Sequence, residues 1–256
     1  MIHPQAIIDP SANIAEDVSV GPFTVIGANV EIDSGTTIAS HVVINGPTKI
    51  GKDNRIFQFS SVGEKPQDLK FNDEPTELIV GDRNTIREYV TLHRGTPGGG
   101  NVTRIGNDNL FMASSHVAHD CIIGNHVILA NATALAGHVI VDDYVILGGY
   151  TTVHQFTRIG AHAFSGFSTA IDRDVLPFFI VAGNRARAVG INKEGLKRRS
   201  YSPETIRALQ DTFKLLIKST CSLKVALGKV EEMAQRDENV RMMINFLDAS
   251  ERGWIR

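Results

Sequence analysis

Residues 105–171 have the sequence IGNDNLFMASSHVAHDCIIGNHVILANATALAGHVIVDDYVILGGYTTVHQFTRIGAHAFSGFSTAI. Within this stretch an aliphatic residue returns at almost every sixth position, from Ile105 through Leu135 to Ile171, and a small or short-branched residue follows four positions later. Neither the 3.6-residue period of a helix nor the two-residue period of a strand produces this pattern. A hexapeptide repeat does produce it, and such repeats form parallel β-helices.

The same six-residue step covers most of the chain. It begins at Ile8, runs without a slip to Val62 and resumes at Val80, and 23 of its 25 positions hold Ile, Leu or Val. Each aliphatic side chain is expected to point into a narrow prism, where stacked coils bury one another. The sequence therefore predicts a mainly β fold, a hexapeptide-repeat solenoid over residues 1–189.

Two interruptions of the repeat predict protruding loops. If three hexapeptides form one coil, positions three repeats apart stack vertically, and Val62 and Val80 are separated by that interval. We therefore expect the segment near 64–78 to be a loop that replaces one whole coil. The glycine-rich segment near 94–103 predicts a second loop. Insertions in solenoids collect on the binding face.

Histidines gather at the corner from which both loops leave. Because every third repeat stacks on the one before, four histidines lie on one face in successive coils: His93, His119, His138 and His154. His116 lies one position before this face. A single histidine is usually structural. Five at one corner of a repeat that otherwise uses small residues indicate a functional site.

Two kinds of chemistry fit this cluster. Three neutral imidazoles would suffice to bind zinc. Alternatively, His119 followed by Asp120 offers an imidazole, a group that titrates near neutral pH, beside a carboxylate that can orient it. Gly137 shares the vertical column of His119 with Gln155, and its backbone N–H could stabilise a developing oxyanion. The residues by themselves leave both chemistries open.

Composition limits the class of protein. The 256 residues carry a formal net charge of −2, whereas general nucleic-acid binding favours a strongly basic surface. The presence of only two cysteines argues against a disulfide framework. No apolar run approaches the length that a membrane span requires, and the first residues lack the pattern of a secretory signal. A reduced, cytoplasmic setting is expected.

The repeat decays beyond Ile171. Residues 178–200 (FFIVAGNRARAVGINKEGLKRRS) predict an irregular connector whose arginines suit an anionic ligand. Ser202 and Pro203 predict the N-cap and first position of a helix. Further helices are expected over about 223–235 and 238–249, so that residues 190–256 form a small C-terminal helical domain.

Several stretches together resemble one family. QDLKF (67–71), TLHRG (91–95), HVAHDCIIGN (116–125), LAGHVIVDD (135–143), VHQF (153–156) and INKEGLKRR (191–199) resemble the UDP-N-acetylglucosamine 3-O-acyltransferases of lipid A biosynthesis, over essentially the whole chain. The resemblance implies a left-handed β-helix and a homotrimer with active sites between subunits. It also implies transfer of an (R)-3-hydroxyacyl group from acyl carrier protein to the glucosamine 3-hydroxyl of UDP-N-acetylglucosamine, with no metal or cofactor of the enzyme's own.

The resemblance further implies roles for individual residues. His119 would be the general base, Asp120 would orient it, and the Gly137 N–H would stabilise the oxyanion during direct attack without a covalent intermediate. Substrate contacts would come from Asp68, Lys70, His93, His116, His138, His154, Gln155, Asn192, Glu194, Arg198 and Arg199. Phe167 stands where a family member that uses long acyl chains has glycine. Its phenyl ring is expected to shorten the acyl groove, because a close-packed slot cannot absorb the extra volume.

Three alternatives compete with this interpretation. The first is a hexapeptide acyltransferase with another acceptor, such as an amine on a glucosamine derivative; the KRR connector and the QDLK loop disfavour it. The second is a zinc-dependent carbonic anhydrase on the same solenoid, which stoichiometric zinc would support. The third is a non-enzymatic solenoid used for binding or scaffolding, which predicts no penalty for replacing His119.

Overall fold

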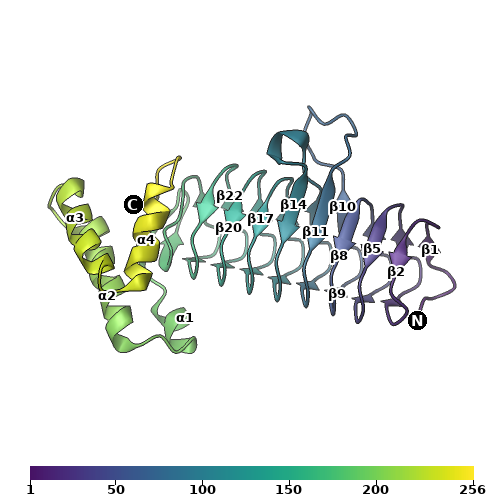
Figure 1. Cartoon of the computed structure of the whole chain (residues 1–256), viewed down its shortest axis with the longest axis horizontal. Coiled ribbons are helices and arrows are strands. Elements are labelled where there is room, and N and C mark those ends of the chain that lie inside the picture. The colour runs from purple at the N-terminus through teal and green to yellow at the C-terminus, as the bar shows by residue number, and fades with distance from the viewer.

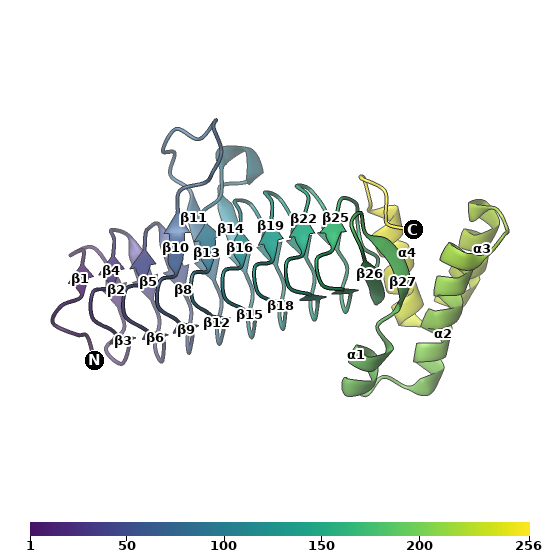
Figure 2. The same cartoon turned by 180° about the vertical axis from the view of Figure 1, so that it is seen from behind.

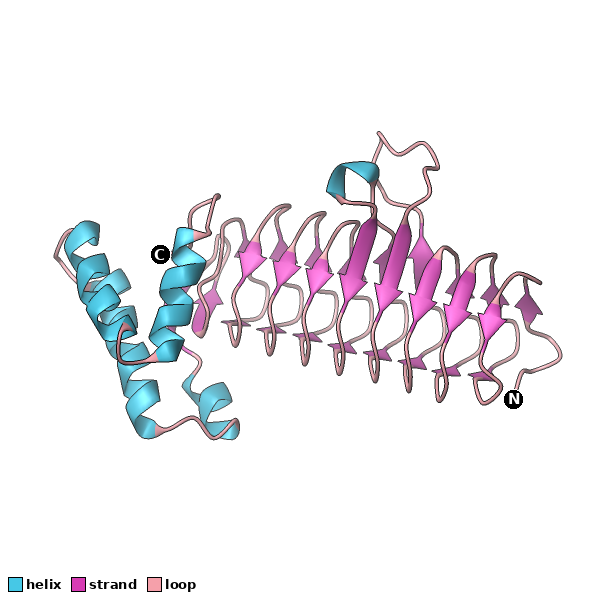
Figure 3. Ribbon diagram, in the orientation of Figure 1, coloured by secondary structure: helices cyan, strands magenta, loops and turns pink.

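In the computed structural model, which describes residues 1–256, short strands form a long three-sided prism, and helices gather at its C-terminal end (Figures 1 and 3). Successive strands along the chain belong to different sides, and strands on one side pair in parallel. The molecule is a left-handed parallel β-helix with a helical C-terminal region. The fold class predicted from the repeat is confirmed.

Each side of the prism is one sheet. The first sheet contains β1 (Ile7–Ile8), β4 (Val25–Ile26), β7 (Val43–Ile44), β10 (Ser61–Glu64), β13 (Thr91–His93), β16 (His116–Val117), β19 (Ala134–Leu135), β22 (Thr152–Val153) and β25 (Ala170–Ile171). The second contains β2 (Asn13–Ile14), β5 (Val30–Ile32), β8 (Thr48–Ile50), β11 (Glu77–Val80), β14 (Val102–Ile105), β17 (Ile122–Ile123), β20 (Ile140–Val141) and β23 (Arg158–Ile159). The third contains β3 (Ser19–Val20), β6 (Thr37–Ile38), β9 (Arg55–Ile56), β12 (Thr85–Ile86), β15 (Leu110–Phe111), β18 (Ile128–Leu129), β21 (Ile146–Leu147), β24 (Phe164–Ser165), β26 (Phe179–Ala182) and β27 (Arg187–Ile191).

The core is the column of aliphatic residues that the repeat predicts. Ile44, Leu92 and Leu135 occupy this position in the first sheet, and none of them is exposed to solvent. The residue four positions later is buried as well, as at Thr133 and Val139. Burying one such aliphatic side chain contributes about 1.5–3 kcal/mol. Because every coil adds the same set, the prism is stabilised by repetition along its whole length.

The chain turns between sheets through left-handed backbone. The residue three positions after the core aliphatic has a positive φ in most coils, for example Asp120 (φ 60) and His138 (φ 62). We call the turns from the first to the second sheet the first corner, from the second to the third the second corner, and from the third to the first the third corner. Non-glycine residues rarely adopt this conformation, so the sheet pairing on either side must stabilise it.

Both loops leave the prism at the first corner (Figure 1). Residues 65–76 join β10 to β11, and residues 94–101, which include the short 3-10 turn η1 (Pro97–Gly99), join β13 to β14. The expectation that the first loop replaces a whole coil is wrong. The register pairs Ile50 with Val80, which lie five hexapeptides apart along the chain, whereas residues that pair between regular coils lie three hexapeptides apart. The coil between them keeps all three of its strands, and the loop is an insertion of two hexapeptides into it.

The segment after the repeat is more regular than the sequence suggests. Residues 178–200 do not form an irregular connector, because β26 and β27 form an antiparallel hairpin that extends the third sheet, and α1 (Lys193–Arg198) follows directly. Glycine and arginine in this segment conceal the strand pattern. The hairpin closes the open end of the prism and so protects its last sheet edge.

The helices after residue 200 begin where the sequence predicts. They are α2 (Pro203–Phe213), continued by the π-helical turn η2 (Lys214–Lys218), then α3 (Leu223–Ala234) and α4 (Glu238–Asp248). The Ser202 hydroxyl accepts a hydrogen bond from the Thr205 N–H, which confirms it as the N-cap. Ile206, Leu209 and Phe213 are buried along one stripe of α2. None of the helices combines the length and the apolar composition needed to cross a bilayer.

Candidate active site

The centre of the site is a hydrogen-bonded pair at the first corner. Asp120 occupies the left-handed turn position after β16, and its Oδ2 atom lies 2.7 Å from Nδ1 of the neighbouring His119. A carboxylate can only accept, so Nδ1 of a neutral His119 carries the proton. The Nε2 atom of the same ring then has a free lone pair. The adjacent pair predicted from the sequence is therefore geometrically coupled.

The loop over residues 94–101 holds the carboxylate of this pair through Thr96. The Thr96 N–H donates to Oδ1 of Asp120 at 2.7 Å, and the Thr96 hydroxyl donates to Oδ2 at 2.6 Å. The side chain of Asp120 is completely buried. Burial opposes its charge, but hydrogen bonds from His119 and Thr96 outweigh burial and hold the pKa of the carboxyl below its usual range. The carboxylate thus stays charged wherever a histidine titrates.

Gly137 lies directly against the ring of His119, one coil further along. A Cβ atom on Gly137 would stand 2.5 Å from Cε1 and 2.7 Å from Nε2 of His119, closer than atoms can approach. The backbone N–H of Gly137 donates to no acceptor in the chain. The same is true of the equivalent N–H groups of His119 and Gln155, so what distinguishes Gly137 is its position beside Nε2.

Other histidines surround this pair. His138 lies perpendicular to His119 with ring centroids 5.2 Å apart, and its Nε2 is 3.7 Å from Asp120 Oδ2. Burial lowers the pKa of His138 despite the nearby Asp120 charge. His116 is bonded through Nδ1 to the Thr91 hydroxyl at 2.7 Å. His93 packs edge-on against His116, and burial lowers its pKa to about 4, so it is neutral.

The first loop also reaches the pair. Its Gln67 lines a hollow of about 370 Å³ together with His116, His119 and Gly137. The charge of Asp68, in the same loop, partly opposes the lowering of the pKa of His138 by burial. Lys70 is exposed, and no side-chain partner holds it. Gln67 and Thr96 are site residues that reasoning from the sequence missed, because a loop position carries no periodic signal.

His154 and Gln155 stand on the next coil of the same corner and are exposed. The Nδ1 atom of His154 contacts the backbone oxygen of Gln155 at 3.1 Å. Neither side chain reaches Asp120. The stacking rule thus predicted the corner on which they lie, whereas close contact is limited to the histidines nearer the loops.

Comparisons with known proteins place this geometry in a family. A family model described as "Udp N-acetylglucosamine O-acyltransferase; Domain 2" matches residues 174–255, and one described as "Bacterial transferase hexapeptide (six repeats)" matches residues 11–46 and 103–137. A curated relative from Saccharophagus degradans, named acyl-[acyl-carrier-protein]--UDP-N-acetylglucosamine O-acyltransferase, is 54% identical over 100% of this chain and 99% of its own. The chain belongs to the UDP-N-acetylglucosamine O-acyltransferase family.

Solved structures agree with this assignment. The LpxA protein of Acinetobacter baumannii is 45% identical, with a TM-score of 0.96 over 100% of this chain and 99% of that one. The UDP-N-acetylglucosamine acyltransferase of Francisella novicida is 40% identical, with a TM-score of 0.97 over 100% and 94% of the two chains. The acyltransferase therefore shares the β-helix and the helical cap with these relatives.

A metal ion fits the first corner of the acyltransferase poorly. His119, Asp120 and His138 offer ligand atoms within 4.8 Å of one another. Both oxygens of Asp120, however, already accept hydrogen bonds from Thr96, and Nδ1 of His119 is committed to the same carboxylate. Binding a cation there would break the buried hydrogen bonds that Asp120 accepts.

The cysteine next to the pair is not a nucleophile. Cys121 follows Asp120 directly, but it is completely buried and its Sγ donates to the Ala136 oxygen at 3.2 Å. Burial raises the pKa of this thiol to about 12, so the thiolate that attacks a thioester does not form at neutral pH. Cys121 therefore offers no thiolate to be acylated at this corner.

The predicted nucleotide-binding residues lie elsewhere on the acyltransferase. α1 sits on the side of the prism away from the loops (Figures 1 and 2), and Arg199 stacks over Tyr144 at the second corner at 4.8 Å. Asn192 is buried, and its side chain accepts a hydrogen bond from the Gly195 N–H and donates one to the backbone oxygen of His162. The structure thus commits Asn192 to anchoring α1. Glu194 and Arg198 are exposed on α1.

Phe167 lies at the third corner, between β24 and β25. It is 72% exposed and meets Tyr150 edge-on at 5.5 Å. Within one chain, the predicted site residues therefore occupy three different corners of the prism. The structure brings together Asp120, Gly137 and the four histidines nearer the loops, but neither His154, Phe167 nor the residues of α1.

Proposed function

We propose that the protein transfers an (R)-3-hydroxyacyl group from acyl carrier protein to the glucosamine 3-hydroxyl of UDP-N-acetylglucosamine, the first step of lipid A biosynthesis. The single observation that carries this proposal is the buried Thr96–Asp120–His119 chain, which leaves Nε2 of His119 free beside Gly137. The substrates are those in the name of the curated relative. A base without a nearby nucleophile suits direct transfer between them.

The geometry supports the following reaction. Nε2 of His119 removes the proton of the sugar hydroxyl, and the oxygen attacks the thioester carbonyl. The Gly137 N–H donates to the resulting oxyanion. Asp120 stabilises the imidazolium that forms. When the intermediate collapses, the carbon–sulfur bond breaks, and the imidazolium returns the proton to the departing thiolate. All charges are accommodated without a metal, a cofactor or an acyl-enzyme.

The distribution of residues around the prism supports a homotrimer. The base lies at the first corner, Arg199 at the second and Phe167 at the third. A three-fold assembly of prisms sets one corner of each subunit against a different side of its neighbour. An active site between subunits would then combine His119 of one chain with Arg198 and Arg199 or Phe167 of another.

The remaining contacts follow from charge. Asp68, Lys70, His116, His138, His154 and Gln155 line the same corner as the base and are proposed to hold the sugar and the diphosphate. Arg198 and Arg199, with Glu194, are proposed to serve the nucleotide or the donor's phosphopantetheine, because guanidinium groups bind phosphate bidentately. His93, buried beneath His116, would support this surface from below.

The decisive experiment is an assay with UDP-N-acetylglucosamine and a ladder of 3-hydroxyacyl carrier proteins, in the presence of a chelator. We expect ester product, and a rate roughly 10²–10⁴-fold lower for His119→Ala because a general base is lost. Undiminished activity of His119→Ala would contradict the mechanism. No product with any donor would overturn the function, and glucosamine amines and carbon dioxide hydration would then be tested as alternative reactions.

A further inference from the structure

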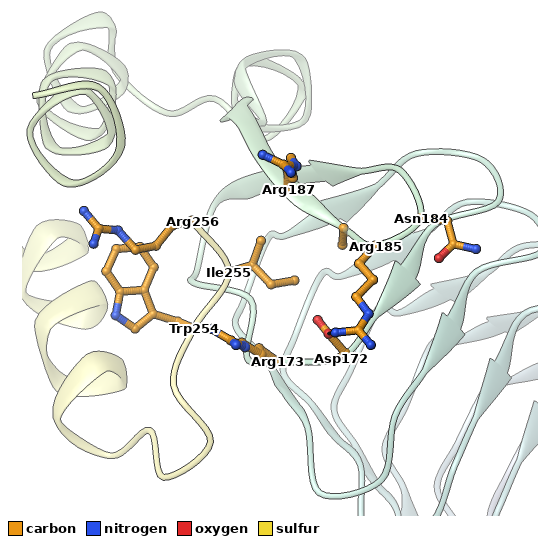
Figure 4. Close-up of a pocket in the computed structure, with 9 residues that line it drawn as sticks. Asp172, Arg173, Asn184, Arg185, Arg187, Trp254, Ile255 and Arg256 are labelled. Atoms are coloured by element: carbon orange, nitrogen blue, oxygen red, sulfur yellow. Dashed lines mark ion pairs between the residues drawn. The ribbon is translucent and has the colours of Figure 1, made fainter.

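A cluster of arginines lies at the junction of the prism and the C-terminal tail (Figure 4). A hollow of about 460 Å³ there is lined by the turn after β25, the β26–β27 turn and the last three residues. We call it the arginine pocket. Its charged residues are Asp172, Arg173, Arg185, Arg187 and Arg256. Four arginines and one aspartate thus line the hollow, in a chain whose formal net charge is −2.

Two of the four arginines have no partner within the chain. Arg185 pairs with Asp172 at 3.3 Å (Figure 4). Arg256 turns over the ring of Trp254 at 5.5 Å and donates to the Leu216 oxygen at 3.3 Å. Arg173 and Arg187 form no ion pair, and their side chains donate to no acceptor. Like charges gathered in one hollow repel one another unless an anion lies between them.

Arg173 and Arg187 are not needed to hold the tail. Trp254 pairs with Asp174 as a parallel bridge, the Ile255 N–H donates to the Asp174 oxygen, and the Asp174 N–H donates to the Gly253 oxygen. Ile255 itself is buried. Backbone pairing and apolar burial therefore fix the tail, which leaves the exposed guanidinium groups of Arg173 and Arg187 free for another task.

The pocket lies on the same edge as the base. The strand register places four residues in one vertical column of the first corner, one in each coil: His119, Gly137, Gln155 and Arg173. Strands in a sheet are about 4.8 Å apart, so three coils separate His119 from Arg173 by roughly 14 Å. An extended phosphopantetheine arm is longer than this.

We propose that the arginine pocket binds a phosphate group, with Arg173 and Arg187 as its principal ligands and Arg185 as a third. Planar guanidinium groups on two turns can each donate two hydrogen bonds to one phosphate. The spacing fits the phosphodiester of the donor's phosphopantetheine, whose thioester would then reach His119. This part rests on the proposed function. A free phosphate has the same chemistry and is the alternative source.

Binding tests the phosphate site directly. Calorimetric titration of the full chain with inorganic phosphate and with 4′-phosphopantetheine should show binding that weakens about tenfold for each guanidinium removed in Arg173→Gln and Arg187→Gln. Both residues are exposed, so the variants should fold, which circular dichroism can verify. Arg55→Gln, an exposed arginine on the third sheet, is the matched control and should bind as the wild type does.

Kinetics identify the source of the phosphate. If it belongs to the donor, the double variant should lose kcat/KM with a 3-hydroxyacyl-phosphopantetheine donor and keep it with the acyl-pantetheine that lacks the phosphate. Phosphate binding with equal kinetics for both donors would support the site and assign it to free phosphate. Binding of neither probe, or binding that the double variant leaves unchanged, would overturn the proposal even if no acyl transfer is detected.

Discussion

One carboxylate organises the residues of the first corner. Asp120 accepts three hydrogen bonds, two from Thr96 and one from His119, and has no solvent contact. Hydrogen bonds to a charged group contribute about 1.5–3 kcal/mol each, which offsets the cost of burying the charge. The result is a fixed tautomer of His119. The left-handed backbone at Asp120 is the local strain that accompanies this arrangement.

Gly137→Ala should abolish most activity without unfolding the protein. The new methyl group would collide with the ring of His119 and displace it from its place beside the Gly137 N–H. The backbone can accept alanine, because the φ of Gly137 is not positive. We expect a loss of at least roughly 100-fold in kcat, comparable to loss of the base or of an oxyanion donor. Gly228→Ala, where a Cβ meets open space, is the control. Retained activity in Gly137→Ala would show that the ring does not need this position.

Phe167→Gly should lengthen the preferred acyl chain. The exposed phenyl ring at the third corner would fill the groove formed with a neighbouring subunit, and removing it would open space for further methylene groups. Each buried methylene contributes about 0.8 kcal/mol, so relative kcat/KM should shift severalfold for each added carbon. Competition between donors of different length measures this shift. An unchanged preference would exclude Phe167 as the determinant of chain length.

Adjacent site residues could be predicted from the sequence, and loop contacts could not. The pairing of His119 with Asp120 follows from their order in the chain and from the stacking of the repeat. Thr96 is 24 residues away from Asp120, in a segment without periodicity, and only the fold shows their contact. Asn192 shows another limit, because nothing in the sequence indicates that its buried side chain bonds to the His162 oxygen and the Gly195 N–H, and its binding role stays a prediction.

At the scale of elements, the two loops act as covers for the first corner. The loop over residues 94–101 covers Asp120 with Thr96, which donates to the carboxylate, and with Gly99. Gly99 lies so close that a Cβ atom on it would collide with the carboxylate. The loop over residues 65–76 adds Gln67 and the charge of Asp68. A regular coil offers no side chain that reaches outward over its own corner, so insertions are required to enclose the site.

Thr96→Val should weaken catalysis and stability together. It removes the hydroxyl that donates to Asp120, and we expect a loss of about 1.5–3 kcal/mol in the free energy of unfolding. Activity should fall about tenfold in kcat with KM nearly unchanged, because the base loses its support. Thr76→Val is the matched control, since its buried hydroxyl has no partner. Equal effects of the two substitutions in denaturation and kinetic assays would refute this role of Thr96.

The hairpin β26–β27 was not predictable at this scale. The repeat ends before it, and a six-residue pattern carries no information about an antiparallel pair. Its register shifts between Ile180 and Val181, which breaks the alternation by which a strand is recognised. The predicted helices were correct because capping residues such as Ser202 and apolar stripes are local signals.

At the scale of the whole molecule, acid should destabilise the prism before carboxylates titrate. Burial lowers the pKa of His93 and of His162 to about 4, from 6.5. Between these values the unfolded chain binds protons that the folded chain does not, so stability falls as pH falls from 6.5 to 4. Each histidine contributes up to about 3 kcal/mol to this loss.

His162→Phe tests this pH dependence. The ring stays within the stack of Tyr144 and Phe178, but it no longer titrates. Denaturation midpoints at pH 7.5 and 4.5 should differ markedly less for the variant than for the wild type. The same difference in both proteins would mean that other groups cause the acid sensitivity.

The proposed sharing of active sites between subunits predicts complementation. A chain with His119→Ala and a chain with Arg198→Gln and Arg199→Gln should each be inactive. Random co-assembly of equal amounts should restore about a quarter of the wild-type activity, because each site draws its base and its arginines from different chains. Size-exclusion chromatography with light scattering verifies the trimer. Mixtures that stay inactive although mixed trimers form would place each site within one chain.

The coil itself limits how such an enzyme can adjust to donors of different length. A register of three hexapeptides allows the prism to gain or lose only whole coils, since any other change would turn the aliphatic columns out of the core. The distance along the prism from the base to any residue that lines the acyl groove therefore changes in steps of about 4.8 Å. Finer adjustment must come from single side chains at the corners. A new acyl length is thus more accessible through one substitution, as at Phe167, than through a longer scaffold.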